Sequence, residues 1–499
     1  MIYPYAVKPA PRMIFGHPAG LFNLFLTEMW ERFSFYGMRA ILVLFLVADP
    51  ADGGLGLAPV TAAALYSGYN ATVYLLAMPG GWVADRLTGT RRAVFVGGVV
   101  IAAGHYILAI PADVTVYLGL VLVAVGTGLL KPNISTMVGE LYDRLPDQHH
   151  AKRDSGFSLF YMGINVGAWA GALTTGWLAL RYGWHVGFAA AAIGMTIALI
   201  QYVAAGRSLG DVGRTAHRPL DEYRRGLILR RIGYFGLMGL LALTLASVLL
   251  SALTDHALLD SVLLLVPPIV VAVPIAFFAS MLREHTLTAP ERSRVVAYVP
   301  IFCAAALFWM IYDQSGNLLN LFADAKVNNQ LLGFEFPASW YQSLNPLLIL
   351  LLAPLFAFAW ARLGDRAPST PVKFSVGLLG IGGSFVIMGF AGAAATSGAI
   401  SPLWLFSVYL VQTVAELFLS PIGLSVTTKL APTRFASQMM GLWFLATATG
   451  DAVGVYVLRL NSVLGDAVYY GLLGALAGVV GVAFLLLAPR IKALMAGVD

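Results

Sequence analysis

Residues 28–39 read EMWERFSFYGMR and hold four charges within one predicted membrane helix. Two glutamates and two arginines interrupt a run that is otherwise apolar from Leu21 to Ala48. Each charged residue placed at a bilayer centre costs about 2.5–3.5 kcal/mol on insertion scales. Four such residues in one helix therefore need partners inside the protein and a role that offsets their cost.

The composition predicts an integral membrane protein. Of the 499 residues, 59% are hydrophobic and 11% are charged, whereas soluble domains carry roughly 25% charged residues. The single cysteine, Cys303, excludes an internal disulfide and a cysteine metal cluster, and we expect neither a metal nor a cofactor. The N-terminal MIYPYAVKPAPR lacks an apolar core, so no cleavable signal peptide is expected.

Apolar runs long enough to cross a membrane recur along the whole chain. A spanning helix needs about 20 mostly apolar residues, and Gly and Pro within such runs are tolerated in membrane helices. Fourteen runs qualify and predict an all-α membrane protein. They are 19–48, 60–84, 93–111, 115–141, 155–180, 184–205, 229–252, 259–282, 295–320, 338–361, 373–392, 402–429, 434–459 and 466–489.

The basic residues are distributed unevenly between the two sides of the membrane. With the N-terminus inside, 25 of the 31 Lys and Arg residues fall in cytoplasmic loops, three fall outside and three lie within spans. The positive-inside rule therefore predicts that both termini are cytoplasmic. This placement also accounts for the net charge of +6 without a nucleic-acid partner.

A faint internal repeat divides the chain. GGWVADRLTGTRR, between the second and third spans, and WARLGDRAPSTPVK, in the second half, both put Asp-Arg at a cytoplasmic turn. Two similar halves are typical of transporters whose site lies at the membrane midplane. We predict a six-helix bundle over 1–206, a cytoplasmic loop with an inserted helical pair over 207–290, and a second six-helix bundle over 291–499.

The charges of the first helix lie largely on one face. Glu28 and Arg32 are four residues apart and therefore neighbours. Arg39 lies seven residues beyond Arg32 on the same face, with Tyr36 between them, and Glu31 lies one residue round. An alternative is a Glu28–Arg32 pair that only fixes helix packing, but it leaves Glu31 and Arg39 unexplained.

Few other charges are predicted near the midplane. Lys131 precedes Pro132, which bends its helix. Asp313 has Trp309 one turn before it on the same face, and Glu416 lies in a later span. Carboxylates in the spans outnumber bases, so at least one is expected to bind a proton, as a proton carrier requires.

Two further residues within the predicted spans have more than one interpretation. Asp451, in TATGDAVG, suits a helix-packing or capping role as well as a functional one. His105, in AGHYILA, is interpreted as a hydrogen-bonded core histidine rather than a proton relay. No nucleophile–base pair and no nucleotide-binding motif occurs, so we do not predict an enzyme.

Several motifs together resemble the proton-dependent oligopeptide transporters, a branch of the major facilitator superfamily. TEMWERFSFYGMRAIL resembles the family's ExxER segment, and GGWVADRLTGTRR looks like the superfamily's loop motif. GTGLLKPNIS, FSLFYMGINVGA and QTVAELFLSPIGLS look like three further family signatures. The resemblance implies the major facilitator fold of the bacterial members, with two six-helix bundles and an inserted pair, fourteen transmembrane helices in total. It also implies a place in the cytoplasmic (inner) membrane.

The resemblance also implies roles in proton coupling. Glu28, Glu31 and Arg32 match the family's coupling cluster, with Lys131 as the partner of Glu31. Asp313 takes the position of the family's proton-binding carboxylate, which is usually the longer Glu.

The same resemblance implies a substrate site. Arg39 and Lys131 would meet a peptide carboxylate, and Glu416, with Asn165 and Asn345, would hold the peptide's amino end. Phe35 is a departure, since the family commonly has Tyr there and one phenol hydrogen bond is absent. The other residues assigned to the substrate site are Tyr36, Tyr74, Trp309, Ser420 and Trp443.

The predicted function is proton-coupled symport that imports di- and tripeptides by alternating access. A short peptide is a zwitterion, about 3.3–3.6 Å long per residue when extended, and a cavity with cations and a carboxylate matches both ends. The expected partners are peptides, protons and membrane lipid, and we expect a monomer. The alternatives are a proton-coupled carrier of another small anion or peptide-like compound, a drug-efflux antiporter, and a sensor or channel. Glu416 favours peptide, because a simple anion has no amine to pair with it.

Overall fold

The computed structural model describes residues 12–145, 152–254, 256–331 and 333–497. Fourteen long helices occupy this part of the chain, one at each predicted span, so the all-α prediction is confirmed. The ends of the termini predicted to be cytoplasmic, 1–11 and 498–499, lie outside the described residues. The long helices are α1 (Ala19–Val47), α2 (Pro59–Val83), α3 (Thr90–Leu108), α4 (Asp113–Asp143), α5 (Arg153–Tyr182), α6 (Trp184–Ala204), α7 (Glu222–Thr254), α8 (Leu258–Arg283), α9 (Ala289–Tyr312), α11 (Leu344–Leu363), α12 (Thr370–Ala394), α13 (Leu403–Leu430), α14 (Ala436–Val457) and α16 (Asp466–Leu494).

Hydropathy alone does not identify every long helix. Eleven helices in the described part of the chain are long and apolar enough to cross a membrane, and α1, α2 and α5 fall short. In α1 the cause is charge, because every window of 18 residues holds at least three of its four charged side chains. The helix that carries EMWERFSFYGMR is thus one that a hydropathy scan overlooks.

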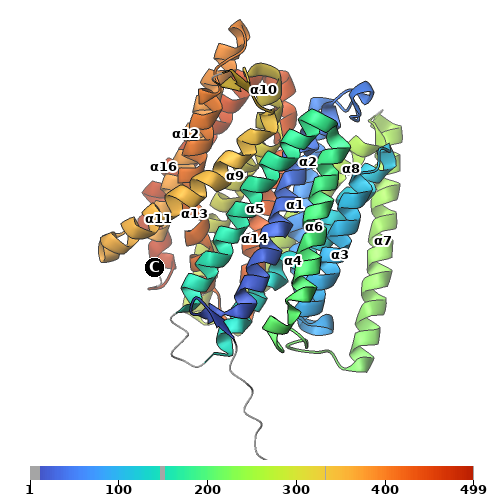
Figure 1. Cartoon of the computed structure of the whole chain (residues 1–499). Helices are drawn as coiled ribbons and strands as arrows, with labels where there is room; N and C mark the ends of the chain where they lie inside the picture. The colour runs from blue at the N-terminus through green and yellow to red at the C-terminus, as the bar shows by residue number, and fades with distance from the viewer. Residues whose placement is uncertain (1–11, 146–151, 255, 332, 498–499) are drawn as a thin grey trace, which may run out of the picture.

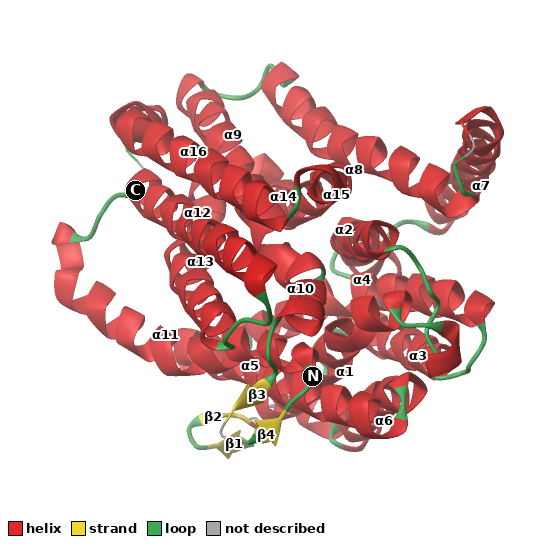
Figure 2. Ribbon diagram, turned by 90° about the horizontal axis from the view of Figure 1, so that it is seen from above, coloured by secondary structure: helices red, strands yellow, loops and turns green. Residues whose placement is uncertain are grey.

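The long helices form two bundles with a pair at the edge. Helices α1–α6 pack among themselves, as do α9, α11–α14 and α16. Figure 2 shows α7 at the periphery beside α8, and only Ser247 of α7 is buried. This arrangement agrees with two six-helix bundles and an inserted pair, while the predicted domain boundaries at 206 and 290 stay a prediction.

Glycines bring the backbones of α1 and α5 into direct contact. A side-chain carbon added at Gly167 or Gly171 of α5 would collide with the carbonyl oxygen of Met29 or Phe33 on α1. Thr175, four residues further along α5, donates a hydrogen bond to the carbonyl oxygen of Gly37 at 2.8 Å. Small residues at this four-residue spacing are typical of close packing between membrane helices.

The predicted span 295–320 is not one continuous helix. A capping box of Thr288 and Glu291 starts α9, which ends at Tyr312. A 3-10 turn, η5 (Asp313–Gly316), and a short helix, α10 (Leu318–Lys326), follow it. A side-chain carbon at Gly316 would overlap the hydroxyl of Tyr66 on α2, so glycine is required for this close approach.

Short elements that the sequence did not predict lie at both ends of the bundle. One hairpin, β1 (Met13–Ile14) and β2 (His17–Pro18), precedes α1, and the other, β3 (Gln330–Leu331) and β4 (Phe334–Glu335), follows α10. We call the end that holds α10 the α10 end; it is the upper end in Figure 1. The remaining short helices and turns are η1 (Pro50–Asp52), η2 (Ala84–Thr88), η4 (Gly206–Leu209), η6 (Ala338–Ser343), η7 (Gly364–Arg366), η8 (Ala395–Ser397), η9 (Thr433–Phe435), η10 (Leu458–Leu460) and α15 (Asn461–Leu464).

Candidate functional site

Arg32 holds together the three charges at the start of the EMWERFSFYGMR stretch. Its Nε and Nη2 each lie 2.7 Å from Oε1 of Glu28, and Nε lies 3.2 Å from Oε2 of Glu31. All three side chains are buried, at 4% exposure or less. One cation thus faces two carboxylates, and a buried charge without a full partner is costly, so the cluster favours binding a proton.

Lys131 and Glu31 do not form an ion pair in the described part of the chain. The Nζ of Lys131 lies 3.8 Å from the centre of the Tyr74 ring, a cation–π contact. Both carboxylate oxygens of Glu31 are buried without a hydrogen-bond partner among the described residues. Lys131 is an electrostatic neighbour of Glu31, but their direct pairing stays a prediction.

Arg39 joins the two halves of the molecule. Its Nη2 lies 3.1 Å from Oδ1 of Asp313, and its Nε donates a 2.7 Å hydrogen bond to the hydroxyl of Tyr66. Its guanidinium carbon also lies 5.6 Å from the ring centres of both Phe35 and Tyr36. Asp313 therefore reaches Arg39 although its side chain is shorter than the Glu that the family usually has. Phe35, where the family commonly has Tyr, lies with its ring near the same guanidinium.

Glu416 is held by neutral partners only. Nδ2 of Asn345, at the start of α11, donates to Oε2 of Glu416 at 2.8 Å and also lies 3.1 Å from the hydroxyl of Thr413. The amide of Asn165 instead bonds the carbonyl oxygen of Tyr161 on its own helix, at 3.0 Å. Glu416 is 8% exposed and has no cation partner among the described residues.

The predicted aromatic residues come from both halves. Trp309 packs edge-on against Tyr312 with ring centres 5.2 Å apart, and its indole nitrogen is buried without a hydrogen-bond partner in the described chain. Trp443 is buried, and a side chain at Gly423 would run into its ring, so that glycine makes room for it. The half-buried members of the predicted set are Tyr36, Tyr74, Trp309 and Ser420.

Three residues that the sequence analysis did not single out belong to the same region. Tyr66 bonds Arg39, and Asn70, one turn further along α2, bonds Asp451 of α14. Tyr161 of α5 is 41% exposed, although Glu416 and Tyr36 are its electrostatic neighbours. Spacing offers a signal for Tyr161, which precedes Asn165 by one turn, but no local pattern marks Tyr66 or Asn70.

The described polar contacts between the two halves gather toward the α10 end. In addition to the Arg39–Asp313 pair, Asn317 donates to Ser67 and Trp340 donates to the carbonyl oxygen of Leu173, both at 3.0 Å. The carbonyl oxygen of Ala40 accepts from Asn320 at 2.9 Å and from Gln342 at 3.4 Å. These contacts hold the two halves together at this end of the bundle.

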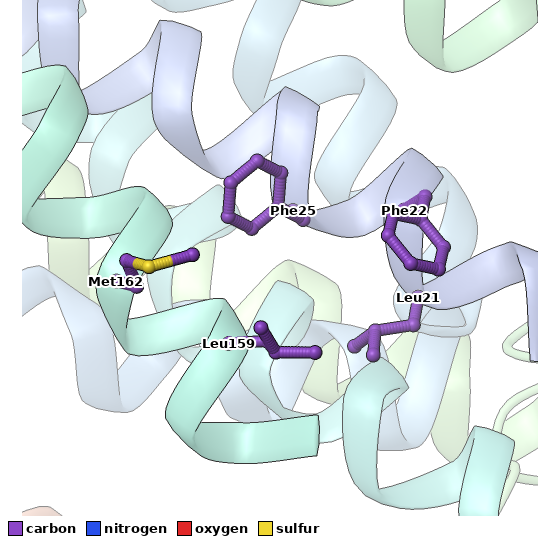
Figure 3. Close-up of a pocket in the computed structure, with 5 residues that line it drawn as sticks. All are labelled: Leu21, Phe22, Phe25, Leu159 and Met162. Atoms are coloured by element: carbon purple, nitrogen blue, oxygen red, sulfur yellow. The ribbon is translucent and has the colours of Figure 1, made fainter. Parts of the chain in front are cut away.

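Two cavities away from these charges differ in character. A cavity of about 70 Å³ between α1 and α5 is lined by Leu21, Phe22, Phe25, Leu159 and Met162 (Figure 3). Its lining is wholly apolar, so it does not suit a charged substrate. A larger cavity of about 430 Å³ lies at the α10 end and is lined in part by the β3–β4 hairpin.

Neither a metal site nor a proton relay through His105 emerges from the described residues. No group of three or more His, Cys, Asp or Glu side chains could hold a metal ion there. His105 is fully buried, as predicted, but neither ring nitrogen has a described hydrogen-bond partner, so that part of its prediction is wrong.

Comparison with known proteins identifies the family. The model of the POT family matches residues 91–468. The chain belongs to the POT family. It is 43% identical to the uncharacterized transporter YclF of Bacillus subtilis (strain 168), with 99% of this chain and 98% of that protein covered. It is 40% identical to the di-/tripeptide transporter of Lactococcus lactis subsp. cremoris, with 98% of both chains covered.

Solved structures of the family share the fold. A crystal structure of a peptide transporter POT in complex with sulfate matches this POT-family chain with a TM-score of 0.91 at 42% identity, covering 98% of each chain. A POT-family transporter in complex with 5-aminolevulinic acid matches with a TM-score of 0.89 at 36% identity, covering 96% of this chain and 98% of that one. The chain is therefore an integral membrane transporter of the major facilitator type, not an enzyme.

Proposed function

We propose that this POT-family chain is a proton-coupled symporter that imports di- and tripeptides by alternating access. One observation carries the proposal: Arg39, from the N-terminal half, lies over the ring of Tyr36, and Glu416, from the C-terminal half, is buried without a cation partner among the described residues. A zwitterionic peptide of two or three residues, about 3.3–3.6 Å long per residue, offers its carboxylate to the first and its ammonium to the second.

The two ends of the peptide have distinct partners in this proposal. Arg39 and Lys131 bind the carboxylate, and Glu416, with Asn165 and Asn345, binds the ammonium. The one amide that bonds Glu416, that of Asn345, is neutral, so the charge of Glu416 remains available for a cationic ligand. The residues that line the space for the peptide side chains are Tyr36, Tyr74, Trp309, Ser420 and Trp443.

Proton coupling is proposed to act through competition for Arg39. In this structure Asp313 holds Arg39 at 3.1 Å, so the same guanidinium is not available to a substrate carboxylate. A proton on Asp313 removes the competing charge and releases Arg39. Glu28, Glu31 and Arg32, with Lys131, form the second proton-handling cluster, because two carboxylates there share one direct cation partner.

The structure corresponds, in this proposal, to the state open to the cytoplasm. The α10 end is closed by contacts such as Trp340 with Leu173, and we assign it to the outer side of the cytoplasmic membrane. Both termini are then cytoplasmic, as the distribution of Lys and Arg predicts. A monomer is sufficient, since all residues invoked come from one chain.

The relatives support peptide as the substrate and also suggest an alternative. The relatives at 40% identity from Lactococcus lactis are di-/tripeptide transporters. The solved relative with 5-aminolevulinic acid favours a second candidate, a compound that carries an amine and a carboxylate but no peptide bond. Such a compound presents the same two charges to Arg39 and Glu416.

Uptake into proteoliposomes tests the proposal. Labelled dialanine should accumulate only with an inward proton gradient, and collapse of that gradient should abolish accumulation. Unchanged uptake without the gradient would refute proton coupling.

Competition with unlabelled compounds separates the two candidate substrates. Inhibition by di- and tripeptides, but not by free amino acids or tetrapeptides, is expected for a peptide carrier. Stronger inhibition by 5-aminolevulinic acid than by any dipeptide would favour the second candidate.

A further inference from the structure

A buried carboxyl group joins the two halves without taking part in the proposed mechanism. Oδ2 of Asp451, on α14, accepts a hydrogen bond of 2.6 Å from Nδ2 of Asn70, on α2. Asp451 is 2% exposed and Asn70 is fully buried. Asn70 lies one turn along α2 from Tyr66, which bonds Arg39 where the two halves meet.

No cation pairs with Asp451 in the described part of the chain. Its charged neighbours are Asp313, Arg39 and Lys131. Arg39 is bound to Asp313 at 3.1 Å, and Lys131 lies over the ring of Tyr74. The carboxyl group therefore has another carboxylate nearby and a single neutral amide as its direct partner.

The helices packed against α14 do not supply a cation either. They are α2, α8, α9 and α13. Arg459, just beyond α14, is paired with Asp260 of α8 at 3.3 Å. Away from the predicted cytoplasmic ends, the titratable side chains of these four helices are Tyr66, Tyr69, Tyr74, Asp260, Tyr298, Cys303, Tyr312, Tyr409 and Glu416. An isolated buried carboxylate is costly and tends to become neutral by binding a proton.

Asn70 supplies a second, independent observation. Its carbonyl oxygen, Oδ1, is buried and accepts no hydrogen bond from the described residues. An ionised carboxylate only accepts hydrogen bonds, whereas a protonated one also has an O–H to donate. A neutral Asp451 next to Asn70 thus offers the donor that Oδ1 lacks, while the amide still donates to its other oxygen.

We propose that Asp451 is a proton-binding residue whose protonated form, paired with Asn70, latches the α10 end shut. Opening that end separates α2 from α14, exposes Asp451 to water and allows it to ionise. This inference rests on the proposed function, in which the α10 end faces the outside. Acid outside the cell then promotes closure of the α10 end after substrate has bound. The proton stays at the closed end, so it adds nothing to the number of protons carried per peptide.

The distance across the α10 end as a function of pH tests this latch without any transport assay. Spin labels are placed at Ala51→Cys and Val463→Cys in a Cys303→Ser background, since both positions are exposed at the α10 end in opposite halves. In detergent, the open-to-closed ratio of the parent should rise with pH, by at most about tenfold per pH unit for one proton. Asp451→Asn keeps the shape and is always neutral, so it should stay closed at pH 8 as the parent does at pH 5.

Two further variants complete the test. Asp313→Asn removes the other carboxyl group nearby. The change of the open-to-closed ratio with pH that Asp451 causes should persist in this variant. Asn70→Ala removes the partner and should open the α10 end at low pH as well; it replaces the main variant if Asp451→Asn does not fold. The latch is refuted if the pH profile of Asp451→Asn overlays that of the parent, or if Asn70→Ala stays closed at low pH. Neither result depends on peptide uptake, so failure of the latch is distinct from failure of the proposed function.

Discussion

The guanidinium of Arg39 contacts the carboxylate of Asp313 and the phenol of Tyr66, and it lies over the rings of Phe35 and Tyr36. At the scale of single residues, this competition for one cation is the centre of the proposed coupling. Removal of the charge should therefore affect transport differently at a residue that binds a proton and at a residue that only binds substrate.

Asp313→Asn is expected to uncouple transport from protons. The amide still accepts a hydrogen bond from Arg39 but cannot ionise, so the site imitates the protonated state permanently. Accumulation of labelled dipeptide under a proton gradient should be lost, whereas exchange of labelled for unlabelled peptide at equal pH should continue. Asp313→Glu, which has the family's usual residue, serves as the control and should retain accumulation; loss of both activities in Asp313→Asn would contradict the coupling role.

Glu416→Gln should weaken binding of the peptide amine. Replacing a charge-assisted hydrogen bond by a neutral one costs about 1.5 kcal/mol, or about tenfold in affinity. We expect KM for dialanine to rise by about that factor. The amide oxygen of the substituted side chain can still accept the hydrogen bond that Asn345 donates. An N-acetylated dipeptide, which has no ammonium group, should bind parent and variant alike, and a normal KM for dialanine would exclude the amine-pairing role.

At the scale of elements, the break after α9 positions Asp313 at a helix end. Hydrophobic length and charge placement were sufficient to predict all fourteen long helices, because a membrane dictates the length of each span. At the break, Gly316 lies against Tyr66, which comes from a helix far away in the sequence. Such a contact leaves no local pattern, and two-residue strands such as β3 and β4 are too short for the alternation that identifies a strand.

Gly316→Ala is expected to destabilise the protein. The added methyl group would overlap the hydroxyl of Tyr66, and such overpacking costs typically about 1–3 kcal/mol. The melting temperature in detergent should fall, and the α10 end should open more often because Tyr66 also holds Arg39. Gly239→Ala, in exposed α7 with open space around it, is the matched control and should leave the melting temperature unchanged or raise it; equal effects of both would show that packing at Gly316 does not matter.

At the scale of the whole molecule, the charges of EMWERFSFYGMR are divided between two tasks. Glu28, Glu31 and Arg32 form a cluster within one half, whereas Arg39 reaches across to the other half. The sequence predicted which residues carry charge in the spans, and family resemblance supplied their proposed roles. The sequence did not predict the Asn70–Asp451 contact, because an uncharged Asn in an apolar helix gives no indication of a partner in the other half.

A disulfide across the closed end should stop transport reversibly. A side-chain carbon at Gly176 of α5 would lie 3.4 Å from the Cβ of Ser339 in η6, close to the usual Cβ–Cβ separation of about 3.5–4.5 Å in a disulfide. In a Cys303→Ser background, Gly176→Cys with Ser339→Cys should lose dipeptide uptake on oxidation and recover it on reduction. Each single cysteine variant is the control. Full uptake by a protein shown to be cross-linked would mean that this end does not open during transport.

The contact between the backbones of α1 and α5 has a mechanical consequence. Where Gly167 and Gly171 meet carbonyl oxygens directly, neither helix can slide or tilt alone without a collision. The two helices then act as one stiff lever that runs the thickness of the membrane. We expect a rotation of this pair about its middle to move its two ends in opposite directions, which would couple opening on one side of the membrane to closing on the other.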